Sequence, residues 1–172
     1  MVMLSHVLLA YEEINKGTEI TSIINKIEER KNKDSVVFVP ENLTALKNGG
    51  RISPAIAAVG NMIGLKPVLV LKDGALDKET MTRNVKKTFH ELIEKLINEK
   101  PISEYDYVIV SFEGNEDLVS HLVKTINKYN PEYEVAVQPV AINICAHCGP
   151  GTIGLFVTPR INSNSINYYF NM

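Results

Sequence analysis

Two cysteines and a histidine lie within four residues near the C-terminal end of the sequence, at Cys145, His147 and Cys148. Thiols and an imidazole can carry redox chemistry, bind a metal ion or handle a proton. Gly149-Pro150-Gly151 follows directly. The glycines permit positive φ angles, and the proline fixes its own φ. We therefore expect a tight turn that holds His147 at the end of a strand and lets a ligand approach the backbone closely.

Three interpretations of this cluster stay open. A redox dithiol needs a strand that leads into a helix whose N-terminus lowers one thiol pKa, whereas an apolar, strand-like run follows here. A zinc site needs about four ligands, and the other histidines, His6, His90 and His121, are expected on helices. The residues favour the third interpretation, in which the cysteines are small buried fillers and His147 faces an anion or handles a proton. The alternative for His147 is a hydrogen-bonded structural histidine at the turn.

A second stretch has the same construction. Gly49-Gly50 is followed by Arg51, and Ser53-Pro54 then supplies an N-cap and a first helical residue. A guanidinium between a glycine pair and a capped helix is suited to hold a carboxylate, in bidentate geometry where access allows. The two stretches together predict an anion site formed by Arg51 and His147.

The elements that position these stretches alternate between strands and helices. Strands are predicted at 35–39, 67–71, 107–112, within 133–140 and at 153–157. Helices are predicted at 2–14, from 18 into the charged run 28–33, and at 42–47, 55–63, 77–99 and 115–130. Because Asp73-Gly74 indicates a hairpin, the pattern predicts an α/β layered domain with a mixed β-sheet flanked by helices. The Asn- and Ser-rich segment 162–172 is expected to be poorly packed.

Composition excludes several classes of protein. The chain has 172 residues, 45% of them hydrophobic and 22% charged, with a net charge of −2. These values are typical of a single globular domain and predict neither a basic nucleic-acid surface nor stable membrane insertion. We see no signal peptide, and two cysteines give no disulfide framework. A cytoplasmic location is therefore expected.

Taken together, the motifs resemble those of the DegV family of bacterial fatty-acid-binding proteins. The resemblance rests on the stretches Leu46-Lys47-Asn48-Gly49-Gly50-Arg51-Ile52-Ser53, Leu65-Lys66-Pro67-Val68-Leu69 with Asp73-Gly74 behind it, Arg83, and Ala146-His147-Cys148-Gly149-Pro150-Gly151-Thr152. Their order and spacing fit the family from the first helices to about Pro159. One departure is Cys148, which stands where the family usually has threonine.

The resemblance implies a carrier of a long-chain fatty acid. Family members bury the acyl chain between two α/β domains and deliver the acid to an ATP-dependent fatty-acid kinase, which forms an acyl phosphate for phospholipid synthesis. By resemblance, Arg51 and His147 lie near the carboxylate, together with the loop residues Gly50, Ser53, Gly149 and Gly151. Arg83, expected on a helix, is then a candidate for docking of the kinase.

The resemblance also implies a division of the chain. Residues 1–40 correspond to two helices and a linking strand left from a truncated first domain, residues 41–160 to the second domain, and residues 161–172 to a tail. No arrangement of nucleophile, base and orienting group is visible, so we expect a binding protein and not an enzyme. Its ligand is the fatty acid, without cofactor or metal. The alternative is a redox or metal-binding protein that uses Cys145, His147 and Cys148.

Overall fold

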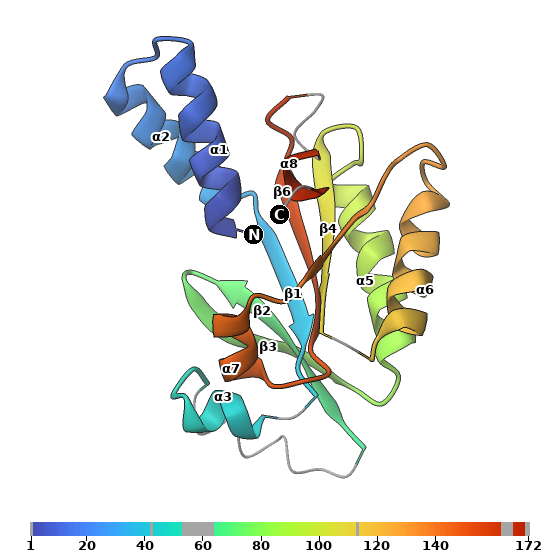
Figure 1. Ribbon diagram of the computed structural model, residues 1–172. Coiled ribbons are helices and arrows are strands. Elements are labelled where there is room, and N and C mark those ends of the chain that lie inside the picture. Colours follow the sequence, from blue (N-terminus) through green and yellow to red (C-terminus); the bar gives the residue numbers. More distant parts are fainter. Residues whose placement is uncertain (1, 42, 53–63, 113, 163–166, 171–172) are drawn as a thin grey trace.

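The computed structural model describes residues 2–41, 43–52, 64–112, 114–162 and 167–170 of the chain (Figure 1). Its centre is a six-stranded sheet with the order β3-β2-β1-β6-β4-β5. The strands are β1 (Ser35–Val39), β2 (Lys66–Lys72), β3 (Ala75–Thr82), β4 (Tyr105–Ser111), β5 (Ala136–Pro139) and β6 (Ile153–Pro159). The helices are α1 (Val2–Asn15), α2 (Ile20–Lys31), α3 (Thr44–Asn48), α5 (Val85–Glu99), α6 (Glu116–Asn127), α7 (Ile142–Cys148) and α8 (Asn167–Phe170).

The sheet is mixed, as the sequence predicts. β4 and β5 run parallel, whereas the other neighbouring strands pair antiparallel. The hairpin between β2 and β3 turns at Asp73 and Gly74, whose φ angles are 50° and 77°. Both angles lie in the left-handed region that two-residue hairpin turns require, and Asp-Gly is among the pairs that adopt it most readily. The expected α/β fold with a mixed sheet is therefore confirmed.

The two faces of the sheet have different covers, because side chains alternate along each strand. One face carries Val37, Ile109 and Leu155, which pack in the main core against α5 and α6. The opposite face carries Val36, Val108 and Phe156. There the short helices α7 and α8 stand at different levels, and α1 approaches β6 from above (Figure 1).

The predicted helix at 77–99 is wrong in its first part. Residues 75–82 form β3, an edge strand whose charged residues Asp77, Lys78 and Glu79 are exposed. The hairpin turn returns the chain along β2, and charged side chains suit an edge strand because they discourage further pairing. α5 begins only at Val85, where the side chain of Asn84 accepts a hydrogen bond from the Lys87 amide at 3.0 Å.

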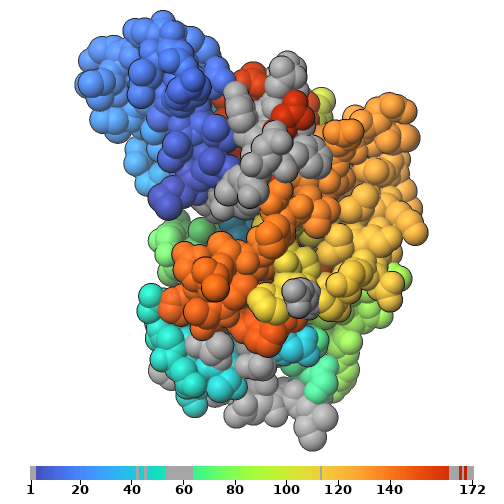
Figure 2. Space-filling model, viewed as in Figure 1, coloured from blue at the N-terminus to red at the C-terminus, as the bar shows by residue number. Residues whose placement is uncertain are grey.

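The two N-terminal helices form a hairpin that projects as a lobe (Figure 2). Thr18, which precedes α2, does not cap this helix, because its hydroxyl donates to Glu13 at 2.9 Å. Glu13 also pairs with Lys16 and Lys26, and these partners lower its pKa from 4.5 to about 2, with Lys26 contributing most. One buried carboxylate thus joins both helices of the hairpin.

Three smaller findings complete the fold. The tail is better packed than the sequence predicts, because Tyr169 of α8 is completely buried. The helix predicted at 55–63 lies outside the described residues. In the part of the chain that the structure describes, we find no helix with both the length and the apolar character needed to cross a bilayer.

Candidate functional site

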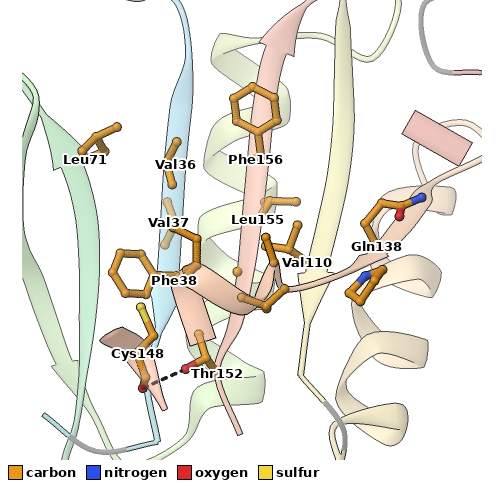
Figure 3. A pocket seen from close by; sticks show the side chains of 15 residues that line it. Val36, Val37, Phe38, Leu71, Val110, Gln138, Cys148, Thr152, Leu155 and Phe156 are labelled. Atoms are coloured by element: carbon orange, nitrogen blue, oxygen red, sulfur yellow. Dashed lines mark hydrogen bonds between the residues drawn. The ribbon is translucent and has the colours of Figure 1, made fainter. Parts of the chain in front are cut away.

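An apolar cavity of about 490 Å³ lies on the sheet face opposite α5 and α6 (Figure 3). It is lined by β1, β4, β5, β6, the end of β2 and α7. The lining residues are Val36, Val37, Phe38, Leu71, Val110, Gln138, Pro139, Val140, Ala141, Ile144, Cys148, Thr152, Gly154, Leu155 and Phe156. None of the described residues in this lining is charged, so the cavity suits an apolar ligand.

The register of the strands shows which residues form the floor of the cavity. Phe38 of β1 and Val110 of β4 both pair with Gly154 of β6, which lies between them. A Cβ atom on Gly154 would lie 3.0 Å from Phe38 Cβ and 3.1 Å from Val110 Cγ2. Glycine at this position therefore lets the two side chains approach each other over β6 and keeps the floor low between them.

One wall of the cavity comes from α7. Ile144 and Cys148 of this helix line it, and the loop after the helix adds Thr152. The Thr152 hydroxyl lies 3.1 Å from the Cys148 carbonyl oxygen and 2.8 Å from that of Gly149 (Figure 3). These contacts satisfy the hydroxyl within the loop and fix the end of α7 against the start of β6.

His147 lies in the last turn of α7, which corrects the expected turn at a strand end. Gly149 ends the helix with φ 78°, and its amide donates to the Cys145 carbonyl at 2.8 Å. Glycine is the usual residue where a helix ends in the left-handed region, so the turn falls two residues after the histidine. His147 is half-buried and is not among the described lining residues, whereas its neighbour Cys148 is.

Arg51 follows α3, which contacts α7. Its guanidinium is exposed and donates to the Gly49 carbonyl at 2.7 Å, while its amide donates to the Leu46 carbonyl at 3.0 Å. Gly50 has the positive φ, 67°, that lets the chain turn back so that the Arg51 amide reaches the Leu46 carbonyl. Arg51 is not among the described lining residues of the cavity. The fold thus brings α3, which Arg51 follows, together with α7, which carries His147, and neither side chain is among the described lining residues.

The loop glycine Gly151 marks a close approach between the two motif-bearing segments. Its φ is 77°, and a Cβ atom there would lie 3.0 Å from Cβ of Glu41. Glu41 begins the segment that leads into α3, and its carboxylate pairs with Lys66 at 2.6 Å. The last predicted site residue, Ser53, lies outside the described residues.

The cysteine pair shows little sign of redox chemistry. Burial, with a smaller contribution from nearby Cys145, raises the pKa of Cys148 from 9.0 to about 11. The Cys145 thiol donates to the Val140 carbonyl at 3.3 Å. A raised pKa disfavours the nucleophilic thiolate. Within the described ranges, no three His, Cys, Asp or Glu side chains gather closely enough to hold a metal ion.

Arg83 lies apart from the cavity lining. It is exposed in the bend between β3 and α5, and not on a helix as expected, because β3 occupies the residues before it. Within the described parts of the chain, its guanidinium has no ion-pair partner. An exposed cation without an internal partner is available for contact with another molecule.

The sequence predicted the loops beside the cavity but missed the cavity itself. Its walls come from residues 36 to 156, and no local motif connects them. The available signal was the alternation of apolar residues in the strands, which shows that both faces of the sheet need cover. The choice of face depends on strand order and register, which no single stretch reveals.

Comparison with known proteins shows which family this chain is similar to. The family model described as "Uncharacterised protein, DegV family" matches residues 4–160. A "Fatty acid-binding protein" of Thermotoga maritima is 33% identical over 148 residues, which are 85% of this chain and 51% of that protein. A crystal structure of a fatty acid binding DegV family protein from Streptococcus agalactiae has a TM-score of 0.77 and 26% identity, covering 91% of this chain and 55% of that one.

A third similar protein is a DegV family protein from Thermus thermophilus, whose structure is described for its fatty acid binding. It has a TM-score of 0.72 and 28% identity, with 91% of this chain and 56% of that chain covered. The chain spans about half the length of the curated relatives it matches. Because the family model matches residues 4–160 of 172, this chain belongs to the DegV family.

Proposed function

We propose that this chain binds the acyl chain of a long-chain fatty acid in the apolar cavity on the sheet. The observation that carries the proposal is the cavity of about 490 Å³, in which every described lining residue is uncharged. Ligand pockets typically have volumes of roughly 300–1,000 Å³. Burial of each methylene group favours binding by about 0.8 kcal/mol, so a long acyl chain gains enough from such a site to be retained. The fatty-acid-binding relatives support the same ligand.

The proposed position of the carboxylate is beside α7, near Arg51 and His147. A carboxylate that leaves water is costly unless hydrogen-bond donors pair with it. The exposed guanidinium of Arg51 can turn away from the Gly49 carbonyl to meet it. Gly50, Ser53, Gly149 and Gly151 are the loop residues that we include in this head-group site. The contact between α3 and α7 supports the proposal, since it puts both loops on one side of the cavity.

We propose further that the bound acid is presented to an ATP-dependent fatty-acid kinase, which phosphorylates the carboxylate to an acyl phosphate. In this scheme the chain is a carrier and needs no cofactor, because burial and charge pairing hold the ligand. Arg83 would belong to the surface that docks the kinase. Its exposure and its absence from the described cavity lining support a contact with protein and not with lipid.

A matched pair of substitutions on α7 tests the cavity. Ile144 lines it and is 47% exposed, whereas Ile142 is 88% exposed and does not line it. In Ile144→Asn an amide meets the acyl chain, so palmitate affinity should fall by about tenfold, because an unpaired buried polar group costs about 1–3 kcal/mol. Ile142→Asn is the control and should retain the affinity.

The measurement is displacement of a fluorescent fatty acid by palmitate, together with native mass spectrometry of the purified chain. A released fatty acid and a loss of affinity confined to Ile144→Asn support the proposal. A chain that carries no fatty acid and displaces no probe would reject it. Arg51→Ala should weaken retention of the acid without loss of fold, and unchanged affinity would remove Arg51 from the head-group site.

A further inference from the structure

The C-terminal helix α8 lies beyond residue 160, where the match to the family model ends. It is only four residues long and comes from an Asn- and Ser-rich segment, yet its Tyr169 is completely buried. The helix contacts β5, and Figure 1 shows it in front of the sheet, beside the upper parts of β6 and β4. This chain therefore places a residue of its own on the face of the sheet that carries the cavity.

Tyr169 packs directly behind the wall of the cavity. It forms one cluster of buried residues with Val108, Ala136 and Phe156. Phe156 also lines the cavity. Gln138, another lining residue, donates through its side-chain amide to the Tyr169 carbonyl oxygen. Phe156 and Gln138 thus line the cavity and also contact Tyr169.

The register of the strands shows what lies beyond these two residues. Along β6 the residues on this face are Gly154, Phe156 and then Thr158. Gly154 and Phe156 line the cavity, whereas Thr158 is buried in a polar environment and accepts a hydrogen bond from the guanidinium of Arg30 at 2.9 Å. An acyl chain that follows the sheet can therefore extend only within the layer of Phe156, whose part over β4 and β5 is covered by Tyr169, before it meets Thr158.

That layer is apolar and continuous with the cavity. Val108 and Ala136 pair across β4 and β5 in the layer of Phe156, and both are fully buried. Two residues of strand span about 7 Å, so the covered layer has space for several methylene groups once the ring is gone. The apolar surface for a longer chain is present, and the tyrosine ring occupies the space above it.

We propose that Tyr169 sets the length limit of the acyl chain, as the residue that closes the end of the apolar cavity. The inference rests on the proposed function, since it assumes a fatty acid in the cavity. It adds a specificity-determining residue that lies outside the family-matched segment. Loss of the ring opens the Val108–Ala136 layer to the ligand, whose terminal methyl group then stops at the polar layer of Thr158.

The test measures affinity against chain length in the full 172-residue chain. Saturated fatty acids from decanoate to docosanoate displace a fluorescent fatty acid from the native protein and from Tyr169→Ala. We expect the preferred chain to lengthen in Tyr169→Ala, with about fourfold tighter binding for each further methylene that the opened layer takes. Tyr169→Phe retains the ring and should retain the native length limit.

Tyr129→Ala is the matched control, because it removes the same atoms from a tyrosine that is exposed beyond the end of α6. Its length profile should equal that of the native protein. Circular dichroism verifies that each variant folds. Where Tyr169→Ala does not fold, Tyr169→Leu, which removes less volume, carries the test with a smaller shift in the same direction.

The outcomes separate the two proposals. A shift to longer chains in Tyr169→Ala or Tyr169→Leu, absent in Tyr129→Ala, supports the role of Tyr169. Native and variant proteins that bind fatty acids with one identical length profile overturn the role of Tyr169 and leave the fatty-acid site intact. A native chain that binds no fatty acid of any length overturns the proposed function and this inference with it.

Discussion

Gly154→Ala is the most direct perturbation of the cavity floor. Gly154 lies in the middle of β6, between β1 and β4. An added Cβ atom would lie 3.0 Å from Phe38 Cβ, 3.1 Å from Val110 Cγ2 and 3.1 Å from the Val37 carbonyl oxygen. Phe38 Cβ and the Val37 carbonyl oxygen can move only if β1 moves, whereas Val110 Cγ2 can move by a change of χ1, which is restricted in valine. β1 must therefore give way to accommodate one methyl group.

The expected cost follows from two opposing effects. Overpacking a well-packed core typically costs about 1–3 kcal/mol. Replacement of glycine by alanine lowers the entropy of the unfolded chain, which stabilises the folded protein by about 0.4–1 kcal/mol. Because Phe38 Cβ and the Val37 carbonyl oxygen can move only with β1, we expect the cost of overpacking to exceed the gain from the unfolded chain. The free energy of unfolding should fall by about 1–2 kcal/mol, and for a chain of this size Tm should fall by about 2–8 °C.

Urea unfolding followed by circular dichroism measures this change, with a double-mutant cycle as its control. Val110→Ala removes the Cγ2 atom that the new methyl group would meet. The cost of Gly154→Ala should therefore be smaller in that background, with a coupling energy of about 0.5 kcal/mol or more. A Gly154→Ala protein as stable as the native one, or strictly additive effects in the cycle, would refute the close approach of Phe38 and Val110 over β6.

Three further predictions concern single groups. The pKa of Cys148 is raised from an ordinary 9.0 to about 11, so at pH 8 its thiolate form is about a hundredfold less populated than that of a thiol with the ordinary pKa. Iodoacetamide should therefore label the more accessible Cys145 first. Equal labelling rates by peptide mass mapping would contradict this. The pKa of Glu13 is lowered from 4.5 to about 2, so its contribution to stability should be complete above pH 4.5 and should be lost as the pH falls towards 2. In thermal melts at a series of pH values, Glu13→Gln should flatten this dependence of Tm on pH. An unchanged slope would count against the ion pairs. Arg83→Ala should retain fatty-acid affinity and slow phosphorylation by a partner kinase. The control is Lys86→Ala, which removes an exposed cation on α5 and should leave the phosphorylation rate unchanged. Equal phosphorylation rates in the two variants would remove Arg83 from the docking surface.

Local signals in the sequence were enough for much of the fold. β1 is a β-branched run that ends before Pro40, and the Asp73-Gly74 pair fixed the hairpin, because turn and strand preferences act over a few residues. β3 was missed, since its exposed charges resemble the polar face of the helix that follows. An edge strand of this kind is stabilised by pairing with β2, which acts across the sheet and leaves no pattern within residues 75–82.

In the site, too, some features depend on short stretches of sequence and others on contacts between distant segments. The loops at Arg51 and His147 were visible because glycine, proline and charged residues cluster in short stretches. The burial of Tyr169 was not, because it depends on a sheet face built from strands more than a hundred residues apart. An isolated aromatic residue in a polar tail indicates nothing until an uncovered apolar face is known to lie within its reach.

The lengths of the helices explain why the apolar cavity lies on the face of the sheet opposite α5 and α6. α5 has fifteen residues, so it is about 22 Å long and covers most of a strand's length together with α6. On the opposite face, α7 has seven residues and α8 has four, which correspond to about 10 Å and 6 Å. These two helices stand at different levels of the sheet, and each covers only its own end. In the part of the chain that the structure describes, the apolar strand residues between these two helices line a hollow, which ends where Tyr169 begins.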